Sequence, residues 1–270
     1  MEIPKQLRAP LDTTLGRGLA LAGLVLLGGL TLFAPWVPVD RAALTYGVCH
    51  QIAEHTLHLA GHPLPLCARC TGTYLGALWT LAGLWLLGKW RAAQLPVGRV
   101  LVVLAVFILA WAVDGLNSYL SLFPGFPYLY APNNVLRLAT GMLEGIALAS
   151  VLYPAFNFAV WRETEPRPAI GSLRELLVLV AGAAVLVVVA QAEPGFLLYP
   201  LTVLSLLAVL TMLTLVNSVG VTILARREGQ AGAWRDALPT LAMGLALTFV
   251  ELMGIGLFRA ILTARLGLPF

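Results

Sequence analysis

The sequence predicts an all-α membrane protein, a polytopic bundle of about seven transmembrane helices. Of its 270 residues, 59% are hydrophobic and only 11% are charged, and the mean hydropathy is +0.87. Soluble domains carry about 25% charged residues, so the composition excludes an ordinary soluble protein. Apolar runs long enough to cross a bilayer as helices recur along the chain, without the alternating strand pattern of a β-barrel. We therefore expect a multi-pass protein of the cell membrane.

The first half of the chain is expected to hold four spans, at residues 16–36, 71–87, 97–113 and 135–155. The first is interpreted as a retained span rather than a signal peptide, because no small-residue cleavage site follows it. Pro35 and Pro38 end it, and basic residues close the second span. The third ends at Asp114. Segment 115–134 is rich in proline and aromatic residues, so it is expected to be a loop.

The second half of the chain is expected to hold three spans, at residues 173–190, 197–225 and 237–262. The polar sequence that begins at Trp161 separates them from the first four. Segment 197–225 is longer than a bilayer requires, which permits a tilt. The predicted organisation is a membrane domain at 1–157 that carries a Cys/His loop, a polar linker at 158–172, and three further helices within 173–270.

The distribution of Lys and Arg predicts the orientation. Twelve of these residues fall at the amino terminus and in the second, fourth and sixth connections, and five fall on the other side. Basic residues concentrate on the cytoplasmic side, so we expect a cytoplasmic amino terminus and a carboxy terminus outside. The extracytoplasmic face then holds the Cys/His loop together with Asp114, Asn133, Asn134 and Arg137.

The segment 49–76 contains all three cysteines and all four histidines of the chain. Cys67 and Cys70 have the C-x-x-C spacing that directs two sulfurs at one metal ion, and Cys49 and His50 precede them at a separation typical of zinc ligand pairs. These four residues predict a Cys3His zinc site. Thiolate-rich sets also suit copper(I), so the sequence does not identify the metal by itself.

A second ligand set lies in the same loop. His55, His58 and His62 would share one face of a helix and would present three imidazoles to a metal with an open position. Gly61 and a following proline weaken a helix there, so the alternative is that these histidines only meet water at the membrane surface. Glu54 beside them is a candidate proton acceptor.

A redox function is the third interpretation. On an oxidising face Cys67 and Cys70 would form a disulfide, and the third cysteine would resolve mixed disulfides. Arg69 between them would favour a thiolate. No alternation of strands and helices like that of thioredoxin surrounds the pair, which counts against this interpretation.

These motifs resemble a family of small multi-pass membrane proteins of unknown function, whose signature is C-H-Q followed by C-x-R-C-x-G-x-Y-x-G. The likeness covers residues 44–152. The family pattern maps onto Cys49, His50, Gln51, Cys67, Arg69, Cys70, Gly72, Tyr74 and Gly76, and then onto Asp114, Asn134, Arg137, Gly141 and Gly145. Where the family commonly has Glu-Arg, this chain has Glu54 and His55, which suggests that His55, His58 and His62 are peculiar to it. The family has no assigned activity, so the resemblance implies site residues and no reaction.

Polar residues within apolar runs are costly and mark function or pairing. Asp114 and Arg137 are predicted to pair across consecutive spans; Asp114 is alternatively predicted to orient His50, and Arg137 to bind an anionic lipid head group. Gly72 with Gly76, and Gly141 with Gly145, are predicted to let helices pack closely. Further along the chain, three polar residues are expected either to line a path or to pair within the bundle: Asn217, Glu251 and Arg259.

Two functions are compatible with these residues. The favoured one is a membrane protein with a structural zinc site in its extracytoplasmic loop. The alternative is a metal-dependent membrane enzyme that acts on a lipid or small amphiphile, with Arg137 holding an anionic group and Asp114 or Glu54 moving protons. The expected partner is the lipid bilayer. Basic residues are spread over many short loops, which excludes nucleic acid, and the oligomeric state stays open.

Overall fold

The structure, a computed structural model, describes residues 45–192 and 194–266. The predicted span at 16–36 lies outside these residues. Six long helices occupy the described part, one at each of the later predicted positions: α2 Ala68–Leu86, α3 Gly98–Leu120, α4 Asn134–Val160, α5 Leu173–Gln191, α6 Leu198–Leu224 and α7 Trp234–Leu266. The mostly helical fold is thus confirmed for the described residues.

Five of these helices, α3 to α7, are long and apolar enough to cross a membrane. Helix α2 has 19 residues, as many as α5, but it is less apolar and does not meet this criterion. Its sequence is rich in glycine, alanine and threonine, because it lies between other helices rather than against lipid; Thr71, Gly72, Gly76, Ala77 and Thr80 are all buried.

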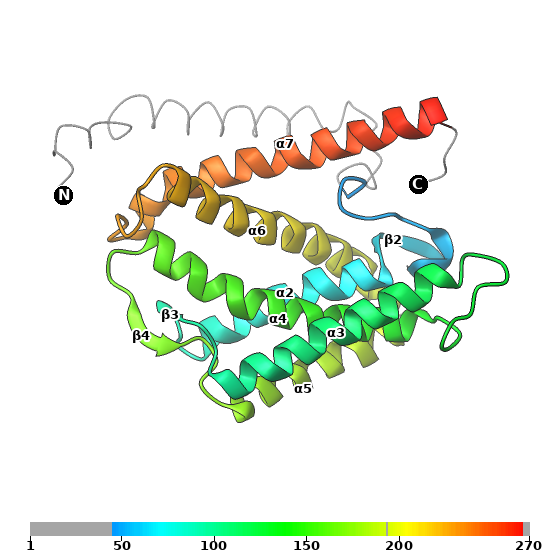
Figure 1. The fold of residues 1–270 in the computed structure, drawn as a ribbon, viewed down its shortest axis with the longest axis horizontal. Helices are drawn as coiled ribbons and strands as arrows, with labels where there is room; N and C mark the ends of the chain where they lie inside the picture. The colour runs from blue at the N-terminus through cyan, green and yellow to red at the C-terminus, as the bar shows by residue number, and fades with distance from the viewer. Residues whose placement is uncertain (1–44, 193, 267–270) are drawn as a thin grey trace.

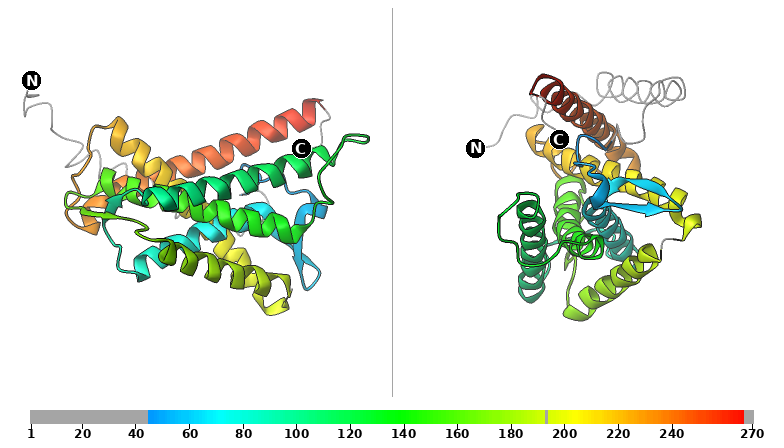
Figure 2. Two further views of the ribbon diagram at one scale, coloured as in Figure 1. Left: turned by 60° about the horizontal axis from the view of Figure 1, so that its bottom comes forward. Right: turned by 90° about the vertical axis from the view of Figure 1, so that its right-hand side faces the viewer.

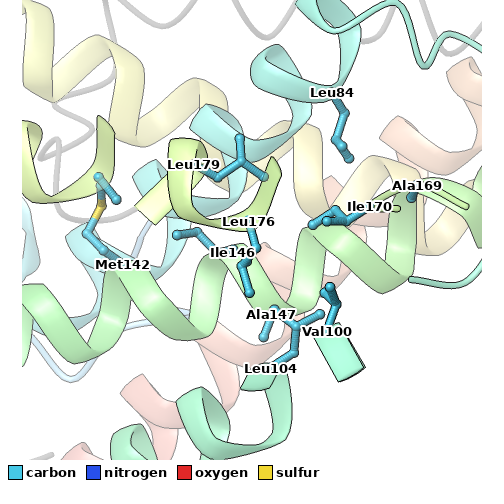
Figure 3. Close-up of a cluster of buried hydrophobic side chains, with 11 residues drawn as sticks. Leu84, Val100, Leu104, Met142, Ile146, Ala147, Ala169, Ile170, Leu176 and Leu179 are labelled. Atoms are coloured by element: carbon cyan, nitrogen blue, oxygen red, sulfur yellow. The ribbon is translucent and has the colours of Figure 1, made fainter. Parts of the chain in front are cut away.

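Helix α4 is the centre of the bundle. It packs against α2, α3, α5 and α6, whereas α7 packs mainly against α6 (Figures 1 and 2). Half of the most apolar window of α4 is buried, compared with 17% for α7. A cluster of buried aliphatic side chains fills the space between α2, α3, α4 and α5, with Ile146 of α4 in its middle and Met142 at one edge (Figure 3).

Glycines bring α2 and α4 into backbone contact, as predicted. A Cβ atom on Gly72 would collide with the carbonyl oxygen of Leu138, and one on Gly76 with that of Met142. In return, Cβ atoms on Gly141 and Gly145 would collide with the carbonyl oxygens of Arg69 and Thr73. Such reciprocal small residues allow the close approach that holds membrane helices together by packing.

Two short sheets depart from the predicted all-α fold. Strands β1 (Thr56–Leu59) and β2 (His62–Cys67) form an antiparallel hairpin after the short helix η2 (Ala53–His55). Ala60 and Gly61 form its two-residue turn with φ of 49° and 79°, as a tight hairpin turn requires. Strands β3 (Ala92–Gln94) and β4 (Glu165–Pro168) pair in parallel. The predicted linker therefore contains a strand, and another short helix, η3 (Gly195–Leu197), precedes α6.

The third predicted span is longer than expected. Helix α3 continues past Asp114 to Leu120, so Asp114 lies within the helix and not at its end. The predicted loop 115–134 is accordingly reduced to residues 121–133. The helix tolerates the buried carboxylate because cationic and hydroxyl partners surround it.

The described connections lie at two ends of the bundle (Figure 1). One, here called the hairpin end, holds β1, β2, the loop 121–133 and the first turns of α2 and α4. The opposite end holds β3 and β4, together with the bridge between Trp161 and Ala231.

Candidate metal centre

The three cysteines meet at the hairpin end. The sulfur atoms of Cys49, Cys67 and Cys70 all lie within 4.8 Å of one another, and none of the three forms a disulfide. Cys49 and Cys67 are buried, and Cys70 is partly exposed. Three soft donors from two separate segments of chain thus converge on one point, which is the arrangement of a thiolate metal site.

The fold positions Cys67 and Cys70 by a strand-to-helix transition. Cys67 ends β2 and is the N-cap of α2, and Cys70 follows within the first helical turn. The backbone N–H of Cys67 donates a hydrogen bond to the sulfur of Cys49 at 3.2 Å. The positive end of the helix dipole and this N–H both favour a thiolate over a thiol.

Cys49 lies on a loop that three contacts hold in place. Thr45 donates its hydroxyl hydrogen to the carbonyl of Pro65 at 2.7 Å, which ties the loop to β2. From α7, Arg259 donates to the carbonyls of Tyr46 and Cys49, the latter at 2.7 Å, and its guanidinium lies over the Tyr46 ring. Gly47 packs so closely on Leu252 of α7 that a Cβ atom would collide with its carbonyl oxygen.

Hydrogen bonds among the sulfurs make the centre anionic. Donation from the thiols of Cys67 and Cys70 holds the pKa of Cys49 far below its ordinary value, against the opposing effect of burial. The sulfurs of Cys49 and Cys67 in turn raise the pKa of His50 to about 9. His50 is not in the group of ligand atoms that lie within 4.8 Å of one another.

The four histidines do not form the second predicted ligand set. His55, His58 and His62 lie in η2, β1 and β2, so the shared helical face does not exist. His55 is buried and contacts His50, with 3.1 Å between Nδ1 and Nε2. Burial, followed by the charge of Arg137, lowers its pKa to about 4, so it is a neutral neighbour at physiological pH. The side chains of His58 and His62 are exposed.

Asp114 pairs with Arg69, and the predicted pair with Arg137 is wrong. Arg69 Nη2 lies 2.5 Å from the carboxylate and also donates to Ser118 at 3.0 Å. Tyr130 donates its hydroxyl hydrogen to the same carboxylate at 2.8 Å. Asp114 is therefore committed to this network and does not orient His50 in the described contacts. Arg69 points away from the cysteines that flank it in sequence.

Arg137 lies in the first turn of α4, only 5% exposed. Its Nη1 donates to Oδ1 of Asn134 at 2.8 Å. Asn134 also donates to the carbonyl of Glu54 at 3.2 Å, which joins α4 to the segment before the hairpin. The Glu54 side chain itself is exposed.

The polar residues of the last helices pair within the bundle. Asn217 of α6 donates to Glu251 at 2.9 Å and to Thr248 at 3.2 Å, both on α7. Arg259 instead holds the Cys49 loop, a role that the sequence did not reveal. In the sequence, Arg259 is an isolated charge near the end of an apolar segment, and this pattern does not identify the group that it contacts.

Comparison with known proteins gives a family and no activity. Residues 49–151 match a family model described as "Predicted membrane protein (DUF2085)". An uncharacterized protein of Methanothermobacter thermautotrophicus is 34% identical over 102 residues, which are 38% of this chain and 81% of that protein. Another uncharacterized protein, from Methanocaldococcus jannaschii, is 25% identical over 137 residues, which are 51% of this chain and 81% of that protein. No solved structure matches the chain.

The matched segment begins at Cys49 and ends within α4. It therefore contains the three cysteines, the hairpin, the Arg69–Asp114 pair and the glycine contact of α2 with α4. Helices α5 to α7 lie beyond it. With most of a relative's length aligned at this identity, the chain belongs to the DUF2085 family of predicted membrane proteins.

Proposed function

We propose that this chain is a multi-pass protein of the cell membrane in which Cys49, Cys67 and Cys70 bind one zinc ion at the hairpin end, with His50 as the fourth ligand. The metal is structural. The observation that carries the proposal is the convergence of the three sulfur atoms within 4.8 Å.

The donor set fits zinc. Zn–S bonds of about 2.3 Å in a tetrahedron place the sulfurs of one site about 3.8 Å apart, which is compatible with the observed convergence. His50 follows Cys49 directly in sequence and is raised in pKa by the sulfurs of Cys49 and Cys67, which makes it the proposed fourth ligand. Nε2 of His50 is hydrogen-bonded to Nδ1 of His55, which leaves Nδ1 of His50 for the metal. A hydrogen bond at the second ring nitrogen is what fixes the tautomer of a metal-bound histidine.

A metal at this point would add a strong link between two segments that hydrogen bonds already join. The Cys49 loop is held by Thr45, Arg259 and the N–H of Cys67, whereas Cys67 and Cys70 belong to the hairpin and α2. Closing a four-ligand shell would fasten the loop to the start of α2. That is the function of structural zinc sites, whose binding energy becomes folding energy.

The proposal places the hairpin end outside the cytoplasm. The basic connections between α2 and α3, between α4 and α5, and between α6 and α7 all lie at the opposite end of the bundle. Positively charged loops mark the cytoplasmic side. This arrangement supports a cytoplasmic amino terminus and seven spans, of which the first is the apolar segment 16–36.

One observation favours a second function: His50 is not among the ligand atoms that lie within 4.8 Å of one another, which are the three sulfurs. Three thiolates would leave a fourth position for water, which is the arrangement of a catalytic zinc ion. The protein would then act on a lipid or small amphiphile at the hairpin end. Asp114 is saturated by its partners, so the exposed Glu54 is the better proton acceptor of the two.

Metal analysis of the purified protein tests the proposal. We expect one zinc ion per chain, lost in Cys49→Ser, Cys67→Ser and Cys70→Ser and retained in His58→Ala and His62→Ala, whose side chains are exposed. X-ray absorption separates the two functions: a shell of three sulfurs and one nitrogen that loses the nitrogen in His50→Ala supports a structural ion, and a bound water supports a catalytic one.

The redox interpretation gives a different result in the same preparation. Alkylation without reductant would then find two of the three thiols blocked and no zinc. Unchanged zinc in Cys67→Ser would contradict the metal site altogether. A carboxy-terminal reporter active only in the cytoplasm would contradict the proposed orientation.

A further inference from the structure

The hairpin end, within the described residues, holds two arginines but only one carboxylate that is paired with either of them. Arg69 and Arg137 lie in the first turns of α2 and α4, close enough to influence each other electrostatically. Asp114 is the carboxylate within this group, and it is paired with Arg69. Among the described residues, no carboxylate lies within ion-pair distance of Arg137.

Arg137 is also unsatisfied as a hydrogen-bond donor. Its Nη1 donates to Asn134, but its Nε is buried without a partner in the described part of the chain. The Nε of Arg69 is in the same state. A guanidinium presents five donors in a planar fork that matches the oxygens of a carboxylate or phosphate. Burying such a charge without a counter-ion is unfavourable, so a partner is expected.

Asp114 cannot supply the missing charge. Its two carboxylate oxygens already accept hydrogen bonds from Arg69, Tyr130 and Thr140. Glu144, about two turns deeper on α4, accepts from Thr73 of α2. Asp114 thus pairs with Arg69 and Glu144 with Thr73, and neither forms an ion pair with Arg137.

Two helix N-termini add to the positive field. Helices α2 and α4 both begin at this end, and the N-cap of α2, Cys67, makes no side-chain capping bond. The neighbouring loop presents apolar side chains at the surface: Phe126 is 58% exposed, Tyr128 53% and Leu129 79%. An anionic group with an apolar tail would meet donors and an apolar surface side by side.

We propose that Arg137, positioned by Asn134 and assisted by Arg69, binds an oxyanion, the phosphate or carboxylate group of an amphiphile or of a small free anion. The site adjoins the metal centre, because Arg69 lies between Cys67 and Cys70, but it uses other side chains and does not require a metal. The Arg137 guanidinium would donate to the oxyanion from its unpartnered Nε, and the N-terminus of α4 would contribute its positive potential.

Calorimetry in an uncharged detergent tests the site with three probes: inorganic phosphate, short-chain phosphatidylglycerol and short-chain phosphatidylcholine. We expect at least one anionic probe to bind and the zwitterionic lipid not to bind. Arg137→Gln weakens binding about tenfold or more, because a charge-assisted bidentate contact is lost. Arg99→Gln, which removes an exposed arginine from the first turn of α3 at the opposite end, leaves affinity unchanged.

The probes distinguish the sources of the anion. Binding of both phosphate and phosphatidylglycerol indicates a site for free oxyanions, and binding of phosphatidylglycerol alone indicates a lipid head group. If Arg137→Gln fails to fold, Arg137→Lys keeps the charge but not the planar fork, and it is expected to bind more weakly than the wild type.

Either of two results would overturn the proposal: wild-type anion affinity in Arg137→Gln, or no binding of either anionic probe to the wild type. If Arg137→Gln keeps its anion affinity but loses zinc, the role of Arg137 is instead to balance the charge of the thiolates, since Cys67 interacts with it electrostatically.

Discussion

Two helix pairs in this bundle are joined by different means. Helices α2 and α4 touch backbone to backbone, through two glycines on each side. Helices α6 and α7 approach closely at Gly244 alone of their described glycines, and Asn217 adds side-chain hydrogen bonds to Thr248 and Glu251. The first pair lies in the segment that matches the family, and the second lies beyond it.

The difference explains where the ionisable residues of the site lie. Glycine packing fixes the distance and rotation of two helices, because each backbone fills the space beside the other. The two helices therefore form one rigid unit, here called the α2–α4 frame. It carries Cys70 and Arg69 on α2 and Arg137 on α4. Interhelical hydrogen bonds in membranes contribute only about 0.6 kcal/mol each. Helix α7 reaches the site through Arg259 and through the contact of Leu252 with Gly47.

The largest effect is expected at the ion pair that joins α3 to this frame. Asp114→Asn leaves the Arg69 guanidinium without its counter-charge at a site where the side chains are 1% and 16% exposed. Removing one member of a buried pair costs about 4 kcal/mol. The free energy of unfolding in mixed micelles measures it. Glu165→Gln, at a half-exposed pair with Arg167, is the control and should cost less than about 1 kcal/mol.

Gly145→Ala tests the packing of α2 against α4 with a smaller expected effect. The added Cβ atom meets the carbonyl oxygen of Thr73 and lies 2.7 Å from the backbone nitrogen of Ala77, so the two helices must separate. We expect a loss of about 2 kcal/mol in the free energy of unfolding. Gly254→Ala on α7 has no atom within 4 Å and should be neutral or slightly stabilising. Equal effects of the two changes would remove the distinction between the helix pairs.

The sequence predicted the helices well, because hydropathy and length determine which segments can be membrane helices. It also brought Cys49, Cys67 and Cys70 together, because C-x-x-C spacing and ligand type are local signals. The hairpin was missed although residues 56–59 alternate polar and apolar side chains, because the strands are only four and six residues long, the second contains two prolines, and Ala60–Gly61 is a weak turn signal. The three later histidines were placed on a helix for the same reason.

The sequence could not predict the ion-pair partner of Asp114, and the reason is different. A sequence gives the depth of a residue in a membrane helix, but not the rotation of one helix against another. Arg137 was chosen as the partner because it lies at a similar depth. The glycine contact rotates α2 so that Arg69 faces α3, and the carboxylate pairs with Arg69 instead.

The smallest expected effect is at Arg259, where α7 meets the metal centre. Arg259→Gln removes two hydrogen bonds to the carbonyls of the Cys49 loop and the stacking on Tyr46, but it leaves every sulfur in place. If zinc binds as proposed, a looser Cys49 should lower its affinity about tenfold, since the ion must then order the loop as it binds. Competition with a zinc chelator measures the change. Arg265→Gln, an exposed residue two turns further along α7, is the matched control. A wild-type zinc affinity in Arg259→Gln would mean that α2 and the hairpin position the three cysteines without help from α7.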